Sequence, residues 1–136
     1  MVKKDNAIKI KIMNYVSTFE EACAKLDIST KLPLVSTFPE SLQKNITATY
    51  KLATIIEVNN GGWKPDIIDP CQWRYYPVFK AVKESGSSGY GISYIGYGCD
   101  CPNAFSFCGS HLACKDEKLA EFMGTTFLEL YKDLYA

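Results

Sequence analysis

The sequence predicts an α+β fold in which all 136 residues form a single domain. Three observations lead to this prediction. Apolar residues recur at helical spacing in residues 18–60 and again in residues 116–135, whereas residues 63–114 are rich in aromatic residues that alternate without a helical period. We therefore expect an antiparallel β-meander of three to four strands, packed on two longer amphipathic helices plus a short N-terminal helix.

The first half of the chain, residues 18–60, is predicted to be helical. Thr18-Phe-Glu-Glu21 is a capping box, whose hydroxyl and carboxylate satisfy main-chain donors of a first helical turn, and it predicts a short helix through Leu26. A second box, Thr37-Phe-Pro-Glu40, predicts a longer helix, because proline suits the first turn. Asn59-Asn60-Gly61-Gly62 is expected to end that helix. Its predicted apolar stripe consists of Leu42, Ile46, Tyr50, Ala53 and Ile56.

The aromatic segment, residues 63–114, is the predicted meander. Trp73 to Val82 indicates one strand, and Tyr90, Ile92 and Tyr94 alternate in a second. The remaining strands are expected around Phe105 and Phe107 and around Leu112 to Cys114.

The two ends of the chain also show periodic patterns. Ala7 to Met13 alternate isoleucines with lysines, which is typical of a half-buried strand. Asp116 is expected to cap a continuous C-terminal helix over residues 116–135. The apolar stripe of that helix consists of Leu119, Phe122, Met123, Phe127, Leu130, Tyr131 and Leu134.

Composition and charge limit the functional classes. Fifteen basic residues balance fifteen acidic ones, so bulk charge does not draw the protein onto nucleic acid or a membrane. The N-terminal stretch lacks the uninterrupted apolar run of a signal peptide or a membrane span, because lysines break it. We therefore expect a cytoplasmic, soluble protein in which the six cysteines are thiols.

One cluster of cysteines offers a metal site. Cys99, Cys101, Cys108, His111 and Cys114 lie within sixteen residues and are of the type that binds zinc in tetrahedral sites. The spacing departs from the usual Cys-x2-Cys knuckle, and free cysteine is often simply buried. The leading prediction is therefore that no cofactor is bound, with zinc as the alternative.

No catalytic motif is present, and we expect that the protein is not an enzyme. His111 is the only histidine, so any mechanism that needs an imidazole must use it. Cys108 lies three residues before it, a spacing that places the two side chains together in no regular geometry. The glycine-rich stretch from Gly86 to Gly91 matches no phosphate-binding loop.

Aromatic residues supply the leading functional prediction. An open sheet face rich in tyrosine is typical of a protein–protein surface, since tyrosine suits positions that are apolar on one side and wet on the other. We expect a protein partner or self-association. Single-stranded nucleic acid, which stacks on aromatic rings, is an alternative partner that the neutral charge of this segment does not favour. The predicted surface consists of Trp63, Trp73, Tyr75, Tyr76, Tyr90 and Tyr94.

The chain also resembles a family. Gly62-Trp63-Lys64-Pro65-Asp66, the run from Gln72 to Pro77, Gly109-Ser110-His111-Leu112 and the run from Leu130 to Leu134 resemble small uncharacterised proteins encoded in prophages and other mobile elements of Bacteroides-type bacteria. The resemblance covers most of the chain from Thr18 onward. It implies the bacterial cytoplasm or a phage particle and implies nothing about catalysis. It also implies that the cysteine cluster is peculiar to this chain.

Overall fold

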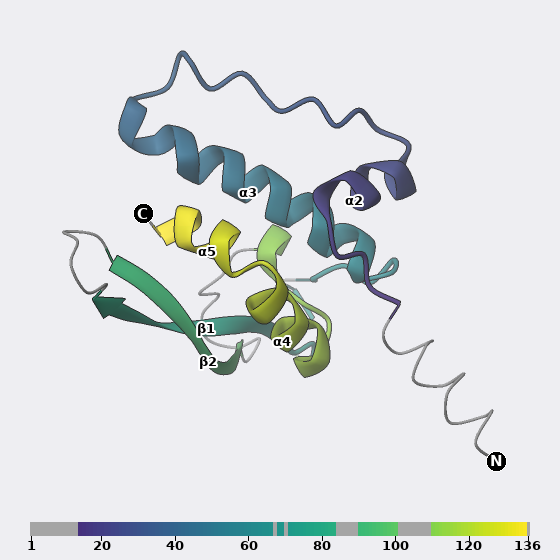
Figure 1. Cartoon of the computed structure of the whole chain (residues 1–136). Helices are drawn as coiled ribbons and strands as arrows, with labels where there is room; N and C mark the ends of the chain where they lie inside the picture. Colours follow the sequence, from purple (N-terminus) through teal and green to yellow (C-terminus); the bar gives the residue numbers. More distant parts are fainter. Residues whose placement is uncertain (1–13, 67, 70, 84–89, 101–109, 136) are drawn as a thin grey trace, which may run out of the picture.

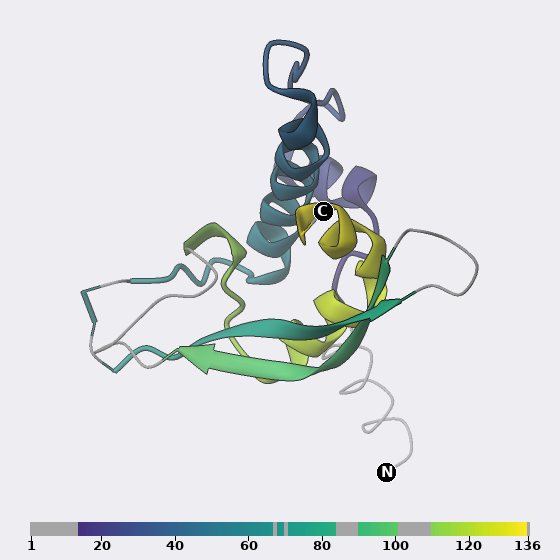
Figure 2. The ribbon, with the colours of Figure 1, turned by 90° about the vertical axis from the view of Figure 1, so that its left-hand side faces the viewer.

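The computed structural model describes residues 14–66, 68–69, 71–83, 90–100 and 110–135. Within these ranges, α5 lies between α3 and the two strands, and α2 packs on α3 (Figure 1). Figure 2 shows the strand pair curving around α4. The α+β class predicted from the sequence is confirmed. The elements are α2 (Phe19–Leu26), α3 (Glu40–Asn59), β1 (Arg74–Lys83), β2 (Tyr90–Asp100), the 3₁₀ turn η1 (Ser110–Leu112), α4 (Glu117–Thr126) and α5 (Leu128–Tyr135).

The short helix α2 begins as the capping box predicts. Thr18 is the N-cap, and its Oγ1 accepts a hydrogen bond of 3.1 Å from the main-chain N–H of Glu21. The Glu21 carboxylate reaches back to the N–H of Ser17 rather than to that of Thr18. The helix ends at Asp27, which adopts the left-handed conformation with φ 54°.

The long helix α3 differs from its prediction at its start and on its face. Its N-cap is Pro39, without a side-chain cap, so the predicted box at Thr37 is wrong. Leu42 from the predicted stripe is exposed. Ile56 of the predicted stripe is buried and Tyr50 packs against the core. The other buried side chains of α3 lie outside the stripe: Ala48, Leu52, Thr54, Ile55 and Asn59. The reason is tertiary: the first turns of α3 extend beyond α2, so an apolar side chain there meets no packing partner from that helix (Figure 1).

The predicted end of α3 is confirmed, and its asparagines have an additional role. Gly61 and Gly62 have φ of 59° and 93°, which end the helix. Asn60 is buried, and its Nδ2 donates a hydrogen bond of 3.0 Å to the carbonyl of Ala113. Its Oδ1 accepts one of 2.9 Å from the N–H of Lys115. Asn60 thereby holds the segment around residue 114 beside β1.

The sheet is smaller than the predicted meander in the part of the chain that is described. β1 and β2 pair antiparallel, with a register shift between Val78 and Phe79, and they confirm the first two predicted strands. Instead of the short strand predicted around Leu112 to Cys114 there are η1 and one isolated bridge, between Tyr75 and Cys114. The predicted strands around residues 105–107 and 7–13 lie outside the described residues.

The C-terminal region forms two helices rather than one. Asp116 caps α4 as predicted, since its Oδ1 accepts a hydrogen bond of 2.8 Å from the N–H of Leu119. The helix then ends at Phe127, and α5 starts at Leu128. This break lets α4 pack on the strands while α5 packs on α3. One continuous helix, as predicted, would not reach both surfaces.

The buried core joins all helices to the segment around residue 114. Its centre is apolar and tightly enclosed, with Leu52, Ile55, Leu119 and Met123 fully buried. Around them lie Val16, Phe19, Ala22, Cys23, Ile56, Cys114, Ala120, Phe127 and Tyr131.

Candidate functional site: an aromatic groove beside β1

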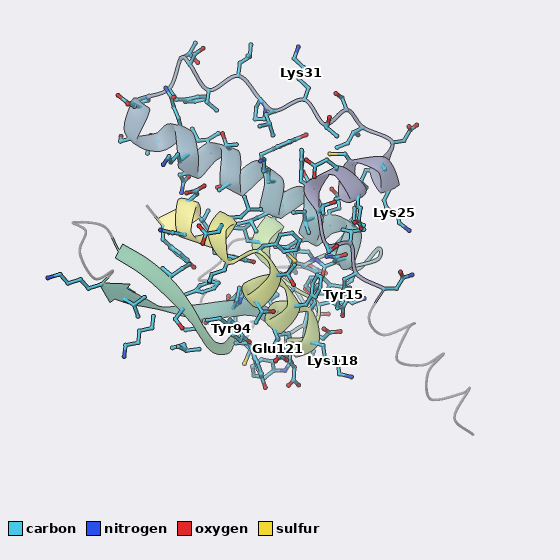
Figure 3. The ribbon with its side chains drawn as sticks, in the orientation of Figure 1. Tyr15, Lys25, Lys31, Tyr94, Lys118 and Glu121 are labelled. Carbon is cyan, nitrogen blue, oxygen red and sulfur yellow. The ribbon has the colours of Figure 1, made fainter. Side chains whose placement is uncertain are left out.

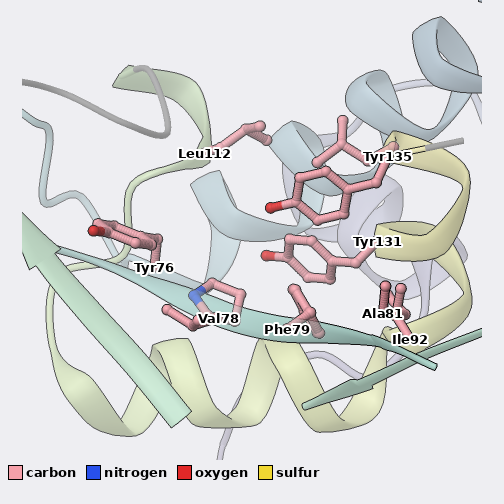
Figure 4. A pocket seen from close by; sticks show the side chains of 10 residues that line it. Tyr76, Val78, Phe79, Ala81, Ile92, Leu112, Tyr131 and Tyr135 are labelled. Carbon is pink, nitrogen blue, oxygen red and sulfur yellow. The ribbon is translucent and has the colours of Figure 1, made fainter. Parts of the chain in front are cut away.

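A pocket of about 550 Å³ lies between β1, β2, η1 and α5, and we call it the β1 groove. In Figure 4, Tyr131 and Tyr135 project from α5 over β1, with Phe79 beneath them and Leu112 across the opening. The groove is therefore built by segments from three separate parts of the chain. Its lining consists of Tyr76, Pro77, Val78, Phe79, Ala81, Ile92, Leu112, Tyr131, Leu134 and Tyr135.

Ring packing holds the tyrosines of the groove in place. The Phe79 ring centroid lies 4.9 Å from that of Tyr131 and 6.0 Å from that of Tyr135. On its other side Phe79 meets the ring of Tyr94 at 6.2 Å. These spacings are those of favourable aromatic pairs, so Phe79 connects the groove to the core.

Among the residues that the structure describes, the lining contains no charged side chain, and tyrosine is its only titratable residue type. Lys80 and Lys83 lie on β1 outside the lining and are exposed. Such a site favours apolar groups and has positive charge beside it.

Consecutive residues of β1, from Tyr76 to Phe79, line this groove, so side chains from both faces of the strand reach it and we infer that the outer edge of β1 faces it. Tyr75 donates a hydrogen bond of 3.0 Å to the carbonyl of Cys114 and accepts one of 2.8 Å from its N–H. Main-chain groups alternate between the two edges of a strand, so those of Phe79 and Ala81 point to the same edge as those of Tyr75. Pro77 also lies in this set and has no N–H to donate.

The predicted aromatic surface is not one surface. Tyr76 lines the groove, whereas Trp63 lines another pocket. Trp73 is exposed, and Tyr75 and Tyr94 are half-buried. The side chain of Tyr90 lies outside the described residues.

The helix α4 explains why the predicted open face is covered. Gly124 of α4 lies so close to the strands that a Cβ there would stand 2.5 Å from Cδ2 of Tyr94 and 2.7 Å from Cβ of Pro77. Sequence alternation indicates that a strand has two faces but not which face a later helix covers.

Tyr94 and Tyr97 meet carboxylates of α4. The Tyr97 hydroxyl donates a hydrogen bond of 2.7 Å to Oε2 of Glu117, and this bond and the carboxylate charge raise the pKa of Tyr97. Burial raises the pKa of Tyr94, and the charge of Glu121 adds to the effect. Figure 3 shows Tyr94 beside Glu121. Both tyrosines therefore stay protonated at neutral pH.

A second pocket, of about 390 Å³, joins two residues that the sequence assigned to different sites. Trp63, from the predicted aromatic surface, and His111, from the predicted metal cluster, both line it. Tyr50 and Glu57 of α3 contribute to its wall.

The cysteine cluster is only partly described. Cys99 is exposed and Cys114 is buried, and they lie on opposite sides of Tyr75, which pairs with both. Two inter-strand spacings separate their main chains by about 10 Å. His111 is exposed in η1, and Cys101 and Cys108 lie outside the described residues. Within the described ranges, no group of three or more potential ligands comes together.

The α5 side of the groove does not belong to the predicted aromatic surface. Tyr131 and Tyr135 lie four residues apart and share one face of a helix, which the sequence shows, but only Tyr131 belongs to the predicted stripe. That both would face β1 depends on the break at Phe127. No pattern in the sequence marks Leu112 as a wall of the groove.

Exposed apolar residues also gather along the segment that connects α2 to α3 and the start of α3. Leu34 is the most exposed of them, at 80%. They show no period, so the sequence gives no sign of their exposure. The set is Ile28, Leu32, Leu34, Phe38 and Leu42.

No protein-family model, curated protein or solved structure matches this chain. The resemblance to prophage-encoded proteins therefore stays a prediction. Among the described residues, no helix combines the length and the apolar character needed to cross a membrane.

Proposed function

We propose that this chain is a non-enzymatic protein-binding module whose β1 groove takes apolar side chains of a partner polypeptide. The single observation that carries the proposal is the lining of the groove, which is apolar and aromatic and, in the part of the chain that the structure describes, has no charged side chain. Concave apolar sites with a few polar groups are typical of ligand pockets. Tyrosine adds contact area at a low cost in conformational entropy.

A polypeptide partner fits the surroundings of the groove better than a nucleic acid does. The buried Arg74, with 2% of its surface exposed, is withdrawn from any contact with a phosphate. The exposed lysines near the groove, Lys80 and Lys83, are too few for the cationic track that single strands need. Single-stranded nucleic acid and zinc remain the alternatives. The mobile-element origin and the cytoplasmic location belong to the same proposal and rest on the sequence alone.

The test is a selection of peptides from a random displayed library on the immobilised protein, followed by affinity measurements on two variants. Ala81→Glu places a charge in the exposed part of the groove, where a bound apolar side chain would have to desolvate it. Val82→Glu places the same charge on the next residue, which is exposed and does not line the groove.

We expect selected peptides to bind Ala81→Glu more weakly than wild type by a factor of about ten or more, and Val82→Glu within a factor of about two. Equal effects of both substitutions, or failure to select any peptide, would contradict the proposal. Concentration-dependent self-association that Ala81→Glu abolishes would identify a second copy as the partner and would also support binding at the groove.

A further inference from the structure

We propose that the partner polypeptide binds the β1 groove as an extended strand that pairs with the outer edge of β1. This inference rests on the proposed function and specifies its partner: a segment with apolar residues at alternate positions and acidic residues near its ends. In such strand addition, main-chain hydrogen bonds supply affinity and pockets for alternate side chains supply specificity.

In the part of the chain that the structure describes, a third strand pairs with β1 through one residue pair only. The two hydrogen bonds between Tyr75 and Cys114 are those of an antiparallel bridge. The residues that precede Cys114 form the 3₁₀ turn η1 and do not continue the pairing with β1. A strand that continued from Cys114 along β1 would lie next to Pro77 and Phe79, which line the groove together with Leu112.

The outer edge of β1 carries main-chain hydrogen-bonding groups that an added strand can use. The main-chain N–H and carbonyl groups of Phe79 and Ala81 point to the outer edge of β1, because every second residue after Tyr75 points to the same edge. Within the described residues, no hydrogen bond outside the β1–β2 pairing engages these groups. Pro77 has no N–H, so the first donor available to an added strand is that of Phe79.

The side chains of an added strand would meet two different surroundings. From Phe79 to Lys83 an edge of five residues is about 17 Å long. Alternate side chains of the partner would face the rings of Tyr131 and Tyr135, and the others would face solvent. Lys80 and Lys83 are exposed on β1, so acidic residues of the partner gain favourable charge contacts.

A second copy of this chain is a poorer occupant of the same edge. Two antiparallel β1 strands paired through Phe79 and Ala81 would place Lys80 directly opposite the Lys80 of the other copy. Like charges in directly opposed positions destabilise strand pairing. The charge pattern therefore favours a partner of different sequence.

The first experiment uses a synthetic peptide of about nine residues, with isoleucine or valine at alternate positions, threonine between them and glutamate at both ends. Two further versions carry N-methyl groups, one on the amides of odd positions and one on those of even positions. Each version loses the donors along only one edge of an extended strand, because donors alternate between edges. Fluorescence anisotropy with the labelled peptide gives the three dissociation constants.

We expect one methylated version to lose affinity by a factor of about ten or more and the other to keep it within a factor of about two. Similar affinities for all three versions would overturn strand addition. If Ala81→Glu still weakens the unmethylated peptide in that case, the proposed function stands and only the strand geometry is wrong. If the unmethylated peptide and the selected peptides all fail to bind the groove, both proposals fall.

The second experiment observes the protein itself, by amide hydrogen exchange of the full chain with and without the unmethylated peptide. Strand addition predicts that the N–H groups of Phe79 and Ala81 become protected, while those of Val78 and Lys80, which point toward β2, change little. Equal protection of all four amides, or of none, in the presence of saturating peptide would contradict the proposal.

A pair of variants provides a further control. Ala81→Pro removes the edge donor, and proline is tolerated on an edge strand, as Pro77 shows. Ala81→Ser keeps the N–H at nearly the same size. We expect weaker peptide binding for Ala81→Pro alone, with the thermal unfolding midpoint of each variant as the check on folding. If Ala81→Pro does not fold, the methylated peptides and the exchange experiment decide the question.

Discussion

The side chain of Asn59 hydrogen-bonds to both main-chain groups of Val16, forty-three residues earlier in the chain. The N–H of Val16 donates to Oδ1 of Asn59 at 2.8 Å, and Nδ2 of Asn59 donates to the carbonyl of Val16 at 3.3 Å. Both residues are buried. The Asn59 side chain therefore satisfies both main-chain groups of Val16, as a paired strand would. These two hydrogen bonds connect the segment before α2 to the end of α3.

Replacing Asn59 with alanine should destabilise the protein by about 1–3 kcal/mol, because the buried main-chain groups of Val16 lose their partner. Urea unfolding measures the change. Glu57→Ala, at an exposed position of the same helix, should change the free energy of unfolding by less than about 0.5 kcal/mol. Equal effects of the two substitutions would show that the Asn59 contact contributes nothing specific.

Gly124→Ala should destabilise the protein by about 1–3 kcal/mol, since the added Cβ would overlap with Tyr94 and Pro77. Its effect exceeds any gain in helix propensity, because a backbone shift is needed to make room. Thermal unfolding measures the change, with Thr125→Ala at the next, exposed position as the control. A stability equal to that of wild type would mean that α4 does not lie so close to the strands.

The hydrogen bond from Tyr97 to Glu117 should make the stability of the protein depend on pH. Because the pKa of Tyr97 is raised in the folded protein, its contribution to stability is present below about pH 10, where an unfolded tyrosine titrates. That contribution is lost as the pH rises through the higher folded pKa. Glu117→Gln should lower the pKa of Tyr97, as NMR titration of isotope-labelled tyrosine measures.

Glu121→Gln serves as the matched control for that titration. It removes a carboxylate from the same helix, and its charge acts on Tyr94 rather than on Tyr97. We expect a smaller decrease in the pKa of Tyr94, because burial is the larger cause of that shift. A Tyr97 titration that Glu117→Gln leaves unchanged would refute the assigned partner.

Thiol labelling and metal analysis separate the predicted free thiols from the zinc alternative. In the folded protein, Cys71 and Cys99 should react quickly because they are exposed, whereas Cys23 and Cys114 should react only after unfolding. Mass spectrometry of the labelled peptides identifies each site. If the folded protein instead holds one tightly bound zinc ion per chain, and Cys99 reacts slowly until that zinc is released, the metal site is established.

Local patterns in the sequence predicted the elements whose determinants are local. The capping box at Thr18, the cap at Asp116 and the glycines that end α3 act within one helical turn, so their residues suffice to identify them. The box at Thr37 failed because Pro39 caps α3 instead. The predicted stripe of α3 was right at Ile56 and wrong at Leu42, because burial along the helix depends on neighbours that are distant in sequence.

The candidate site was less predictable than the fold. Tyr76 and Leu112 come from segments that the sequence marks as aromatic or apolar, but the groove exists only because η1 turns away from β1 and α5 returns over it. The predicted aromatic surface was divided for the same reason. Trp63 and Tyr76 line different pockets, although both belong to one aromatic segment.

By itself, the sequence determined the α+β class, the first two strands and most helix ends, because period, caps and glycine conformation depend on neighbouring residues. Only the tertiary structure decided the break at Phe127, the role of Asn59 and Asn60 as connectors, and the groove beside β1. Each of these depends on contacts between segments far apart in the chain. Such contacts depend on which side chains from distant segments become buried together, and a local sequence pattern does not indicate this.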